Sequence, residues 1–360
     1  MKKLYGLEYY YKNILKNTKT YITNSLLQKE ESYSSFQREK KDGIRTIHGV
    51  SKTSGLYQLQ NNLNRNFFLR IPLSSPAVGF VKGKSYQDYL RPHCGKRFHL
   101  RLDIRGFFDS ISEEQVEESL EEFVQDEDIK KNIVEICMLD GCLPQGAVTS
   151  PALSNIVFRR IDQRILKYCQ SIRKVKYDGK PEEEDIVYTR YADDLFFSSD
   201  SFDFCTRLEF YKVVRHILLE NGFHLNHKKT YMTEGDISLS GFVVGSDVHL
   251  SRKRLREINQ ILNYFDKRAQ IDQKKYEVDI KKLQAPNVLK ELNQLVNTGI
   301  AVKFNNKKAF INYLCGYRAF LITFLKGDCK ESSQIKALKK KVKNLEQIID
   351  QCQKTWFGIV

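Results

Sequence analysis

The chain has 360 residues, 41% hydrophobic and 12% aromatic, and its 59 lysines and arginines outnumber its 44 acidic residues to give a formal charge of +15. This composition excludes a disordered chain, a collagen-like repeat and a disulfide-stabilised miniprotein. No stretch approaches the ~18 uncharged apolar residues of a membrane-spanning helix, and no apolar signal core follows the basic N-terminus. We therefore expect a soluble cytoplasmic protein with no membrane partner.

The first hundred residues are expected to combine helices with one hairpin. Apolar residues at positions 4–15 recur with a mixed helical period. Asp42-Gly43 is a turn signal between two extended arms, which predicts a β-hairpin. A helix is expected from Gly55 to about Leu69, because Pro72 then stops it.

The middle of the chain alternates strands and helices. Residues 98–103 alternate apolar and basic side chains, as a half-buried strand does. Ser112 followed by Glu-Glu-Gln is a helix-start signature, and Pro151 favours the first turn of a further helix. The expected elements are a strand at 98–103, helices at 112–123 and 150–166, a hairpin from 186–191 and 195–198, a helix at 204–220, and a hairpin from 237–244 and 248–250. From Ser251 the chain is expected to be helical, with breaks near Pro286 and at residues 297–299.

The charge is distributed unevenly. Residues 1–100 have a balance of +12, residues 101–250 of −10 and residues 251–360 of +13. An acidic centre between basic ends indicates a centre that holds cations and ends that bind a polyanion. A solvated surface with random variation in charge is the alternative. The tyrosines among the C-terminal lysines suit either a helical core or stacking on unpaired bases; they are Tyr264, Tyr276, Tyr313 and Tyr317.

Two segments place aspartates where a metal site could form. Asp103 ends the strand at 98–103, and Asp193-Asp194 lie at the tip of the hairpin after Tyr191-Ala192. Adjacent aspartates in a turn are by themselves ordinary turn chemistry. Here apolar arms flank them, and their burial is costly unless a cation compensates. Three such carboxylates suffice to hold two Mg²⁺ ions ~3.5–4 Å apart, a pair that catalyses nucleotidyl transfer.

A third segment, Leu143–Asn155, contains Pro-Gln-Gly and leads into the helix that begins near Ser150. Small residues at a helix N-terminus allow close approach of a nucleotide and a template. The alternative is a Pro/Gly loop before a capped helix.

These segments, in this order, resemble the reverse transcriptase family, specifically its bacterial retron-type branch, over about residues 36–250. The matching segments are Asp42–Arg45 and Ala77–Ser85 of the fingers, Asp103–Ile111, the Gln-Gly block Leu143–Asn155, the tetrapeptide Tyr191–Asp194, Leu225–Thr230, and the primer-grip segment Leu239–Gly245. The resemblance implies an α/β right-hand polymerase fold. Its fingers and N-terminal helices would be residues 1–100, its palm, an antiparallel sheet plus helices, residues 101–250, and its basic, RNA-binding helical thumb residues 251–360.

The resemblance also implies roles for single residues. Asp103, Asp193 and Asp194 would be catalytic and bind two Mg²⁺ ions, with the Ile104 carbonyl as a further ligand. Phe108 would exclude a ribose 2′-hydroxyl, as a bulky aromatic side chain beside the sugar should. The other implied substrate-binding residues are Arg45 for the triphosphate, Gln145, Gly146, and Lys229 as proton donor or charge for pyrophosphate. The implied nucleic-acid contacts are Lys82, Lys84, Arg252, Lys253 and Arg254.

Two segments depart from the retron pattern. Tyr89–His93 keeps only the histidine of Asn-Ala-x-x-His, and Leu239-Ser-Gly stands where Val-Thr-Gly is usual. Polymerase chemistry is untouched by these changes, but a defence-associated or abortive-infection relative fits about as well as a retron enzyme.

The expected function is therefore that of an RNA-directed DNA polymerase. It would use deoxynucleoside triphosphates to copy a structured non-coding RNA, which serves as template and primer, into a DNA product. Its expected setting is bacterial anti-phage defence, with an accessory effector protein. The alternatives are a template-independent or protein-primed DNA polymerase and a catalytically silent RNA-binding scaffold.

Overall fold

The structure is a computed structural model that describes residues 3–40, 43–175, 181–183, 185–267, 276–296, 303–326 and 333–358. It divides into two compact units. Residues 1–237 and 244–247 form the first unit, and residues 238–243 and 248–360 form the second. The predicted boundaries of fingers, palm and thumb stay predictions. Within the described ranges, every helix is too short or too polar to cross a membrane.

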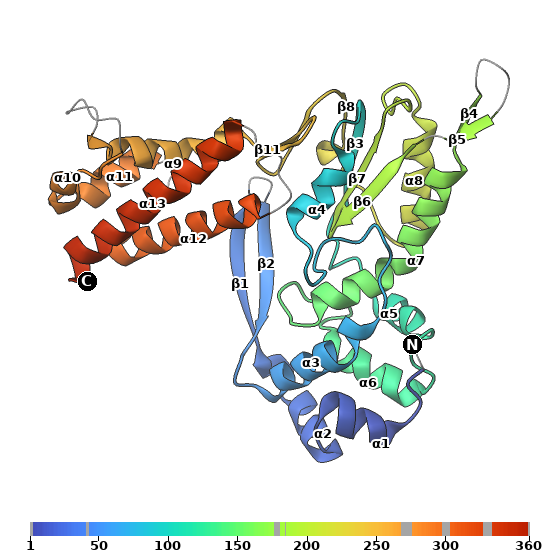
Figure 1. Ribbon diagram of the computed structural model, residues 1–360. Helices are drawn as coiled ribbons and strands as arrows, with labels where there is room; N and C mark the ends of the chain where they lie inside the picture. Colours follow the sequence, from blue (N-terminus) through green and yellow to red (C-terminus); the bar gives the residue numbers. More distant parts are fainter. Residues whose placement is uncertain are drawn as a thin grey trace. The chain divides into compact units, whose positions relative to one another are not determined.

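The N-terminal part of the first unit combines helices with one long hairpin (Figure 1). The elements are α1 (Leu7–Tyr9), which continues as a π-helical turn to Leu15, α2 (Lys19–Leu27), β1 (Tyr33–Lys40), β2 (Gly43–Val50) and α3 (Gly55–Asn66). The predicted hairpin is confirmed, because β1 pairs with β2 antiparallel along its whole length; its turn residue Asp42 lies outside the described residues. The predicted helix from Gly55 is also confirmed. The Ser54 side chain caps it by accepting from the Tyr57 amide.

A four-stranded antiparallel sheet lies at the centre of the first unit. Its order is β6 (Val187–Tyr191), β7 (Asp194–Ser199), β3 (Phe98–Asp103) and β8 (Tyr231–Glu234). The predicted strand at 98–103 and the predicted hairpin are confirmed. In the pairing of β3 with β7, Asp103 is directly opposite Asp194. The sheet thus brings together two aspartates that are 91 positions apart in the sequence.

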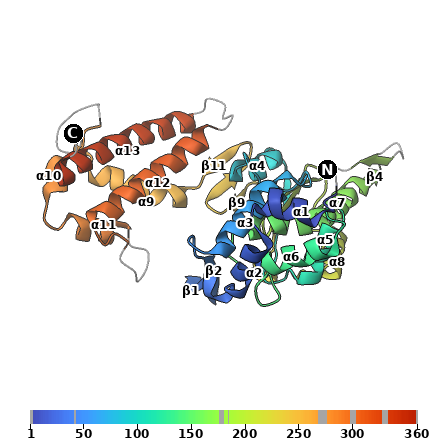
Figure 2. The ribbon, with the colours of Figure 1, turned by 90° about the horizontal axis from the view of Figure 1, so that it is seen from below.

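Helices α7 (Ser150–Ser171) and α8 (Glu209–Glu220) pack against the sheet, and α5 (Glu113–Leu120) lies between α7 and α6 (Glu127–Cys137). Figure 2 shows these four helices from below. Ser112 and Gln115 form the expected capping box of α5. The predicted start of α8 at residue 204 is wrong. The Asp203 side chain accepts hydrogen bonds from the Cys205 amide and the Thr206 hydroxyl, and this local turn delays the helix to Glu209.

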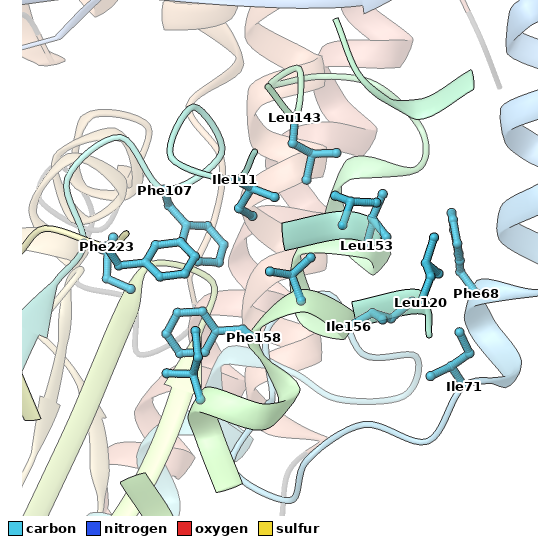
Figure 3. Close-up of a cluster of buried hydrophobic side chains, with 14 of the residues drawn as sticks. Phe68, Ile71, Phe107, Ile111, Leu120, Leu143, Leu153, Ile156, Phe158 and Phe223 are labelled. Carbon is cyan, nitrogen blue, oxygen red and sulfur yellow. The ribbon is translucent and has the colours of Figure 1, made fainter. Parts of the chain in front are cut away.

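The core of the first unit extends under the loop that follows Asp103. Three aromatic rings, Phe107, Phe158 and Phe223, meet there (Figure 3), with centroids 5.1–5.9 Å apart. All three side chains are buried. Because Phe107 is anchored in this cluster, it fixes the backbone of its neighbour Phe108.

A short three-stranded sheet follows, formed by β9 (Ile237–Leu239), β10 (Phe242–Val244) and β11 (Val248–Leu250) in the order β11-β10-β9. The prediction of one continuous strand at 237–244 is wrong. Ser240 and Gly241 have φ angles of 49° and 87° and reverse the chain between β9 and β10. Positive φ at both central residues is typical of a tight hairpin turn. A short two-stranded pair, β4 (Arg173–Val175) and β5 (Pro181–Glu183), precedes β6.

The second unit is mainly helical, as predicted. Its helices are α9 (Arg252–Tyr264), α10 (Ile280–Gln284), α11 (Val288–Val296), α12 (Lys307–Leu325) and α13 (Ser333–Phe357). Figure 2 shows α12 and α13 side by side. The predicted break at Pro286 is confirmed between α10 and α11, whereas the one at 297–299 lies outside the described residues.

Candidate active site

Three aspartates lie at adjoining strand ends of the four-stranded sheet. Asp103 ends β3, Asp194 begins β7 opposite it, and Asp193 lies in the two-residue turn between β6 and β7. The Ile104 amide donates a hydrogen bond of 2.9 Å to the Asp193 carbonyl, which joins the turn to the end of β3. Ala192 has a φ of 56°, so this turn holds a non-glycine residue in the left-handed region.

A buried ion pair between β6 and α7 holds the turn at Ala192-Asp193 in place. The Arg190 guanidinium donates to both carboxylate oxygens of Asp162, at 2.9 and 2.8 Å, and both side chains are fully buried. Arg190 also donates to the Ala192 carbonyl at 3.1 Å, and the Tyr188 hydroxyl donates to Asp162 at 2.7 Å. The network therefore connects α7 to the strained turn that carries Asp193.

Two cationic side chains neutralise carboxylates of this site. Lys229 Nζ lies 3.0 and 3.2 Å from the two carboxylate oxygens of Asp103. Arg101 donates from Nε and Nη2 to Asp194, at 3.0 and 2.7 Å, and both bonds reach Oδ1. The sequence prediction missed Arg101. Its position two residues before Asp103, on the same face of the strand, is the signal that could have identified it.

Burial and mutual repulsion perturb the aspartates. Burial raises the pKa of Asp194 to about 6, against the lowering effect of Arg101. Burial, and then the charge of Asp103, raises the pKa of Asp193, whereas Lys229 and Arg45 lower it. Negative charge at this end of the sheet is therefore costly, and a bound cation would stabilise it.

The donor chemistry of the site fits Mg²⁺, although its side chains are not already arranged around an ion. Carboxylate oxygens are the ligands that Mg²⁺ prefers, and the described residues donate no hydrogen bond to the Ile104 carbonyl. Among the same residues, however, no group of three or more His, Cys, Asp or Glu side chains is placed to hold a metal. Lys229 contacts both oxygens of Asp103, so an ion on that carboxylate requires Lys229 to move.

Phe108 and the Gln-Gly loop lie on segments near these aspartates. Phe108 is half-buried, and its ring lies 6.1 Å from Phe80 and 5.4 Å from Phe107. The Gln145 carbonyl accepts a 2.8 Å hydrogen bond from the His48 amide of β2. Gly146 has a φ of 119°, and a Cβ there would lie 2.9 Å from the His48 carbonyl oxygen. The loop therefore packs directly against the strand that carries Arg45.

The predicted nucleic-acid contacts are exposed lysines and arginines. Lys82 and Lys84 lie in the loop before α4 (Tyr86–Leu90). Arg252, Lys253 and Arg254 occupy the first turn of α9, and this first turn contains no acidic residue. The N-terminus of a helix carries partial positive charge, so positive side chains there are unfavourable on their own. An anion bound at this end would be attracted both by these side chains and by the helix dipole.

The four tyrosines of the second unit have partners within that unit. The Tyr264 and Tyr313 hydroxyls donate to Glu291 and Glu257, at 2.6 and 2.9 Å. The Tyr276 and Tyr317 hydroxyls donate to main-chain carbonyls, at 3.0 and 2.7 Å. These contacts favour the structural alternative for the tyrosines over base stacking.

Comparison with known proteins gives one consistent class. Residues 38–249 match the family described as reverse transcriptase (RNA-dependent DNA polymerase). The chain is 29% identical over 230 residues to the retron Ec86 reverse transcriptase of Escherichia coli, covering 61% of this chain and 65% of that protein. It is 27% identical over 245 residues to the retron Mx65 reverse transcriptase of Myxococcus xanthus, covering 62% and 54%. Among solved structures, apo telomerase from Candida Tropicalis aligns at 12% identity and a TM-score of 0.44, over 89% of this chain and 62% of that one.

The family match covers more than half of the chain, so the chain belongs to the reverse transcriptase family and has its right-hand polymerase fold. Within that family, its similarity to several retron enzymes identifies it as retron-type. The family depends on divalent metal ions. The chain spans 65% and 54% of the length of the two retron enzymes named above.

Proposed function

We propose that the chain is an RNA-directed DNA polymerase that adds deoxynucleotides to a primer by two-metal nucleotidyl transfer. The observation that carries the proposal is the placement of Asp103 opposite Asp194, with Asp193 in the adjoining turn. Burial raises the pKa of both Asp193 and Asp194, so keeping them ionised costs free energy that a bound cation would offset. Membership of the reverse transcriptase family supports the same activity.

The carboxylates of the site and Arg45 have separate roles in this proposal. Asp103, Asp193 and Asp194, with the Ile104 carbonyl, would hold two Mg²⁺ ions. Bound there, these ions supply activation of the primer hydroxyl and stabilisation of the leaving pyrophosphate. Arg45 would bind the triphosphate.

Four further residues would act on substrate and product. Lys229, once released from Asp103, would place a positive charge or a proton at the pyrophosphate. Phe108 would exclude the ribose 2′-hydroxyl. Gln145 and Gly146 would line the position of the templating base.

The template and primer are proposed to be a structured non-coding RNA. The +13 balance of residues 251–360 and the three basic residues in the first turn of α9 support a polyanion partner. Lys82 and Lys84 would add contacts from the first unit.

RNA dependence tests this function directly. The protein is purified with its bound RNA, supplied with deoxynucleoside triphosphates and Mg²⁺, and its DNA products are sequenced before and after ribonuclease treatment. We expect products complementary to the bound RNA and loss of synthesis after the treatment. Products of random sequence that survive ribonuclease would instead indicate a template-independent polymerase.

We further propose that the enzyme works in the bacterial cytoplasm in anti-phage defence, together with an accessory effector protein. The similarity to retron enzymes supports this setting. A strain that expresses this gene together with its neighbouring genes should resist phage, and Asp193→Asn with Asp194→Asn in this gene should abolish that resistance. Full resistance with this variant would separate defence from DNA synthesis.

A further inference from the structure

Phe80 holds an unusual conformation near the active site. Its φ is 64°, in the left-handed region that a bulky aromatic residue rarely adopts. Its side chain is nevertheless 42% exposed, so burial in a core does not account for this conformation. A strained residue persists only where its surroundings fix it, and such residues concentrate at functional sites.

The surroundings of Phe80 fix it against the end of β6. Ala77 forms a parallel bridge with Arg190, and the Val78 amide donates to the Arg190 carbonyl at 2.8 Å. At Gly79 a Cβ would lie 2.6 Å from the Ala192 amide nitrogen, so glycine alone allows this approach. Asn155 Nδ2 donates to the Gly79 carbonyl at 2.8 Å. The segment before Phe80 is thereby held by β6 and by α7.

The Phe80 ring lies between two aromatic residues of the candidate site. Its centroid is 6.1 Å from that of Phe108 and 6.4 Å from that of Tyr191, the residue before the strained turn. Tyr191 is fixed in turn by Tyr86 and Tyr89, with centroids at 5.0 and 5.9 Å. Phe80 therefore links the Phe108 ring to a rigid aromatic group on β6.

We propose that Phe80 is a positioning residue for Phe108 and thereby sets the selectivity for deoxynucleoside over ribonucleoside triphosphates. This inference rests on the proposed polymerase function. A steric gate excludes a hydroxyl only if its ring cannot move aside, and holding a side chain to about 0.5 Å requires packing partners. Phe107 contacts Phe108 from the core, and Phe80 supplies the contact at the exposed side. In this proposal Phe80 acts through Phe108 and takes no part in binding the metal ions.

The test compares the ratio of kcat/KM for dATP to that for ATP on a fixed RNA template. Phe108→Ala gives the reference loss of selectivity. For Phe80→Ala we expect a smaller fall, about 10-fold, through a lower KM for ATP while kcat for dATP changes by less than about twofold. Phe80→Tyr, which keeps the ring, should have the same ratio as wild type. Leu69→Ala, a change at a comparably exposed apolar residue of the same unit, should leave the ratio unchanged.

The double variant distinguishes positioning from an independent effect. If Phe80 acts only through Phe108, then Phe80→Ala combined with Phe108→Ala should be no less selective than Phe108→Ala alone. A further fall in the double variant, or an unchanged ratio in Phe80→Ala, would overturn the inference. Phe80→Gly also removes the ring and suits the positive φ, so it replaces Phe80→Ala if that protein does not fold.

Failure of the inference and failure of the proposed function give different results. A wild-type protein that incorporates no nucleotide contradicts the proposed function. In that case, equilibrium binding of labelled dATP and ATP to wild type and Phe80→Gly still tests the inference without turnover. A preference for dATP that weakens in the variant supports the inference, and identical preferences overturn it.

Discussion

At the scale of single residues, the two cations of the site hold their carboxylates differently. Lys229 contacts both oxygens of Asp103, in the place that a metal ion would take. Arg101 donates only to Oδ1 of Asp194, so Oδ2 of that carboxylate can still bind a metal ion. We therefore expect Mg²⁺ to compete with Lys229 and to coexist with Arg101.

The first prediction is that Lys229→Ala lowers the thermal midpoint in EDTA but increases the rise that Mg²⁺ causes. Without Lys229 the Asp103 carboxylate, which is 3% exposed as a residue, has lost its cation, and bound Mg²⁺ replaces it. A change of about 3 °C in each quantity is expected. Lys228→Ala, at the exposed neighbouring position, is the control. An unchanged Mg²⁺ response in Lys229→Ala would contradict competition for Asp103.

The buried Arg190–Asp162 pair gives the second prediction. Arg190→Met leaves the Asp162 carboxylate buried without its cation, which should cost about 3–5 kcal/mol of unfolding free energy. Urea unfolding measures this loss. Arg164→Met removes a pair with Glu220 whose side chains are 51% and 41% exposed, and it should cost less than about 1 kcal/mol. Equal losses in both variants would show that the buried pair has no special role in stability.

At the scale of elements, a buried histidine connects the 3-10 turn Arg91–His93 to the hairpin of β6 and β7. His93 Nδ1 lies 2.7 Å from the Ser198 hydroxyl of β7, and Nε2 lies 2.8 Å from the Thr189 hydroxyl of β6. Burial, and then the charges of His99 and Lys96, lower its pKa well below the usual value. The folded state therefore holds His93 neutral.

The third prediction follows from that pKa. Because the unfolded chain binds a proton at about pH 6.5 and the folded chain does not, His93 should weaken stability as pH falls below about 6.5. The unfolding free energy lost through His93 is up to ~1.4 kcal/mol for each pH unit below this value. Urea unfolding at pH 7.5 and 5.5 should show a smaller loss for His93→Gln than for wild type. The same loss in both proteins would assign the pH dependence to other groups.

Sequence patterns predicted those elements whose signal is local. The alternation at 98–103 and the capping box at Ser112 gave a strand and a helix that the structure confirms. Errors arose where a short-range contact overrides the pattern, as in the Asp203 turn before α8 and in the Ser240-Gly241 turn. The Arg190–Asp162 pair joins residues 28 positions apart, and no local pattern encodes such a contact.

For the site, the sequence pointed to the three aspartates and to Lys229, but it did not predict Arg101 or the contact between Lys229 and Asp103. A motif names the residues that carry chemistry, whereas Arg101 and Phe80 matter through what they contact in space. Arg101 could have been inferred from the period of the strand. Phe80 could not, because only the structure reveals its strained backbone and its contact with Phe108.

At the scale of the whole molecule, the candidate catalytic centre lies in the acidic segment 101–250, whereas the helical segment 251–360 is basic. The fourth prediction is that bound RNA dissociates steeply as salt rises, and that reversing Arg252, Lys253 and Arg254 to Glu lowers that salt slope by about 3. Filter binding across a salt series measures the slope. Reversing Lys12, Lys16 and Lys19 makes the same change in net charge on exposed N-terminal residues. Equal slopes for the two triple variants would make RNA binding a property of net charge alone.

The central claim is that Asp103, Asp193 and Asp194 form the centre of a DNA polymerase. The most direct measurement is incorporation of labelled deoxynucleotide on an RNA template by wild type and by Asp193→Asn with Asp194→Asn, at matched thermal midpoints and matched RNA binding. The two asparagines keep the volume of the side chains and remove their charge. We predict incorporation by wild type and a loss of at least about 1,000-fold in the variant. Incorporation at the wild-type rate by the folded, RNA-bound variant would contradict the account.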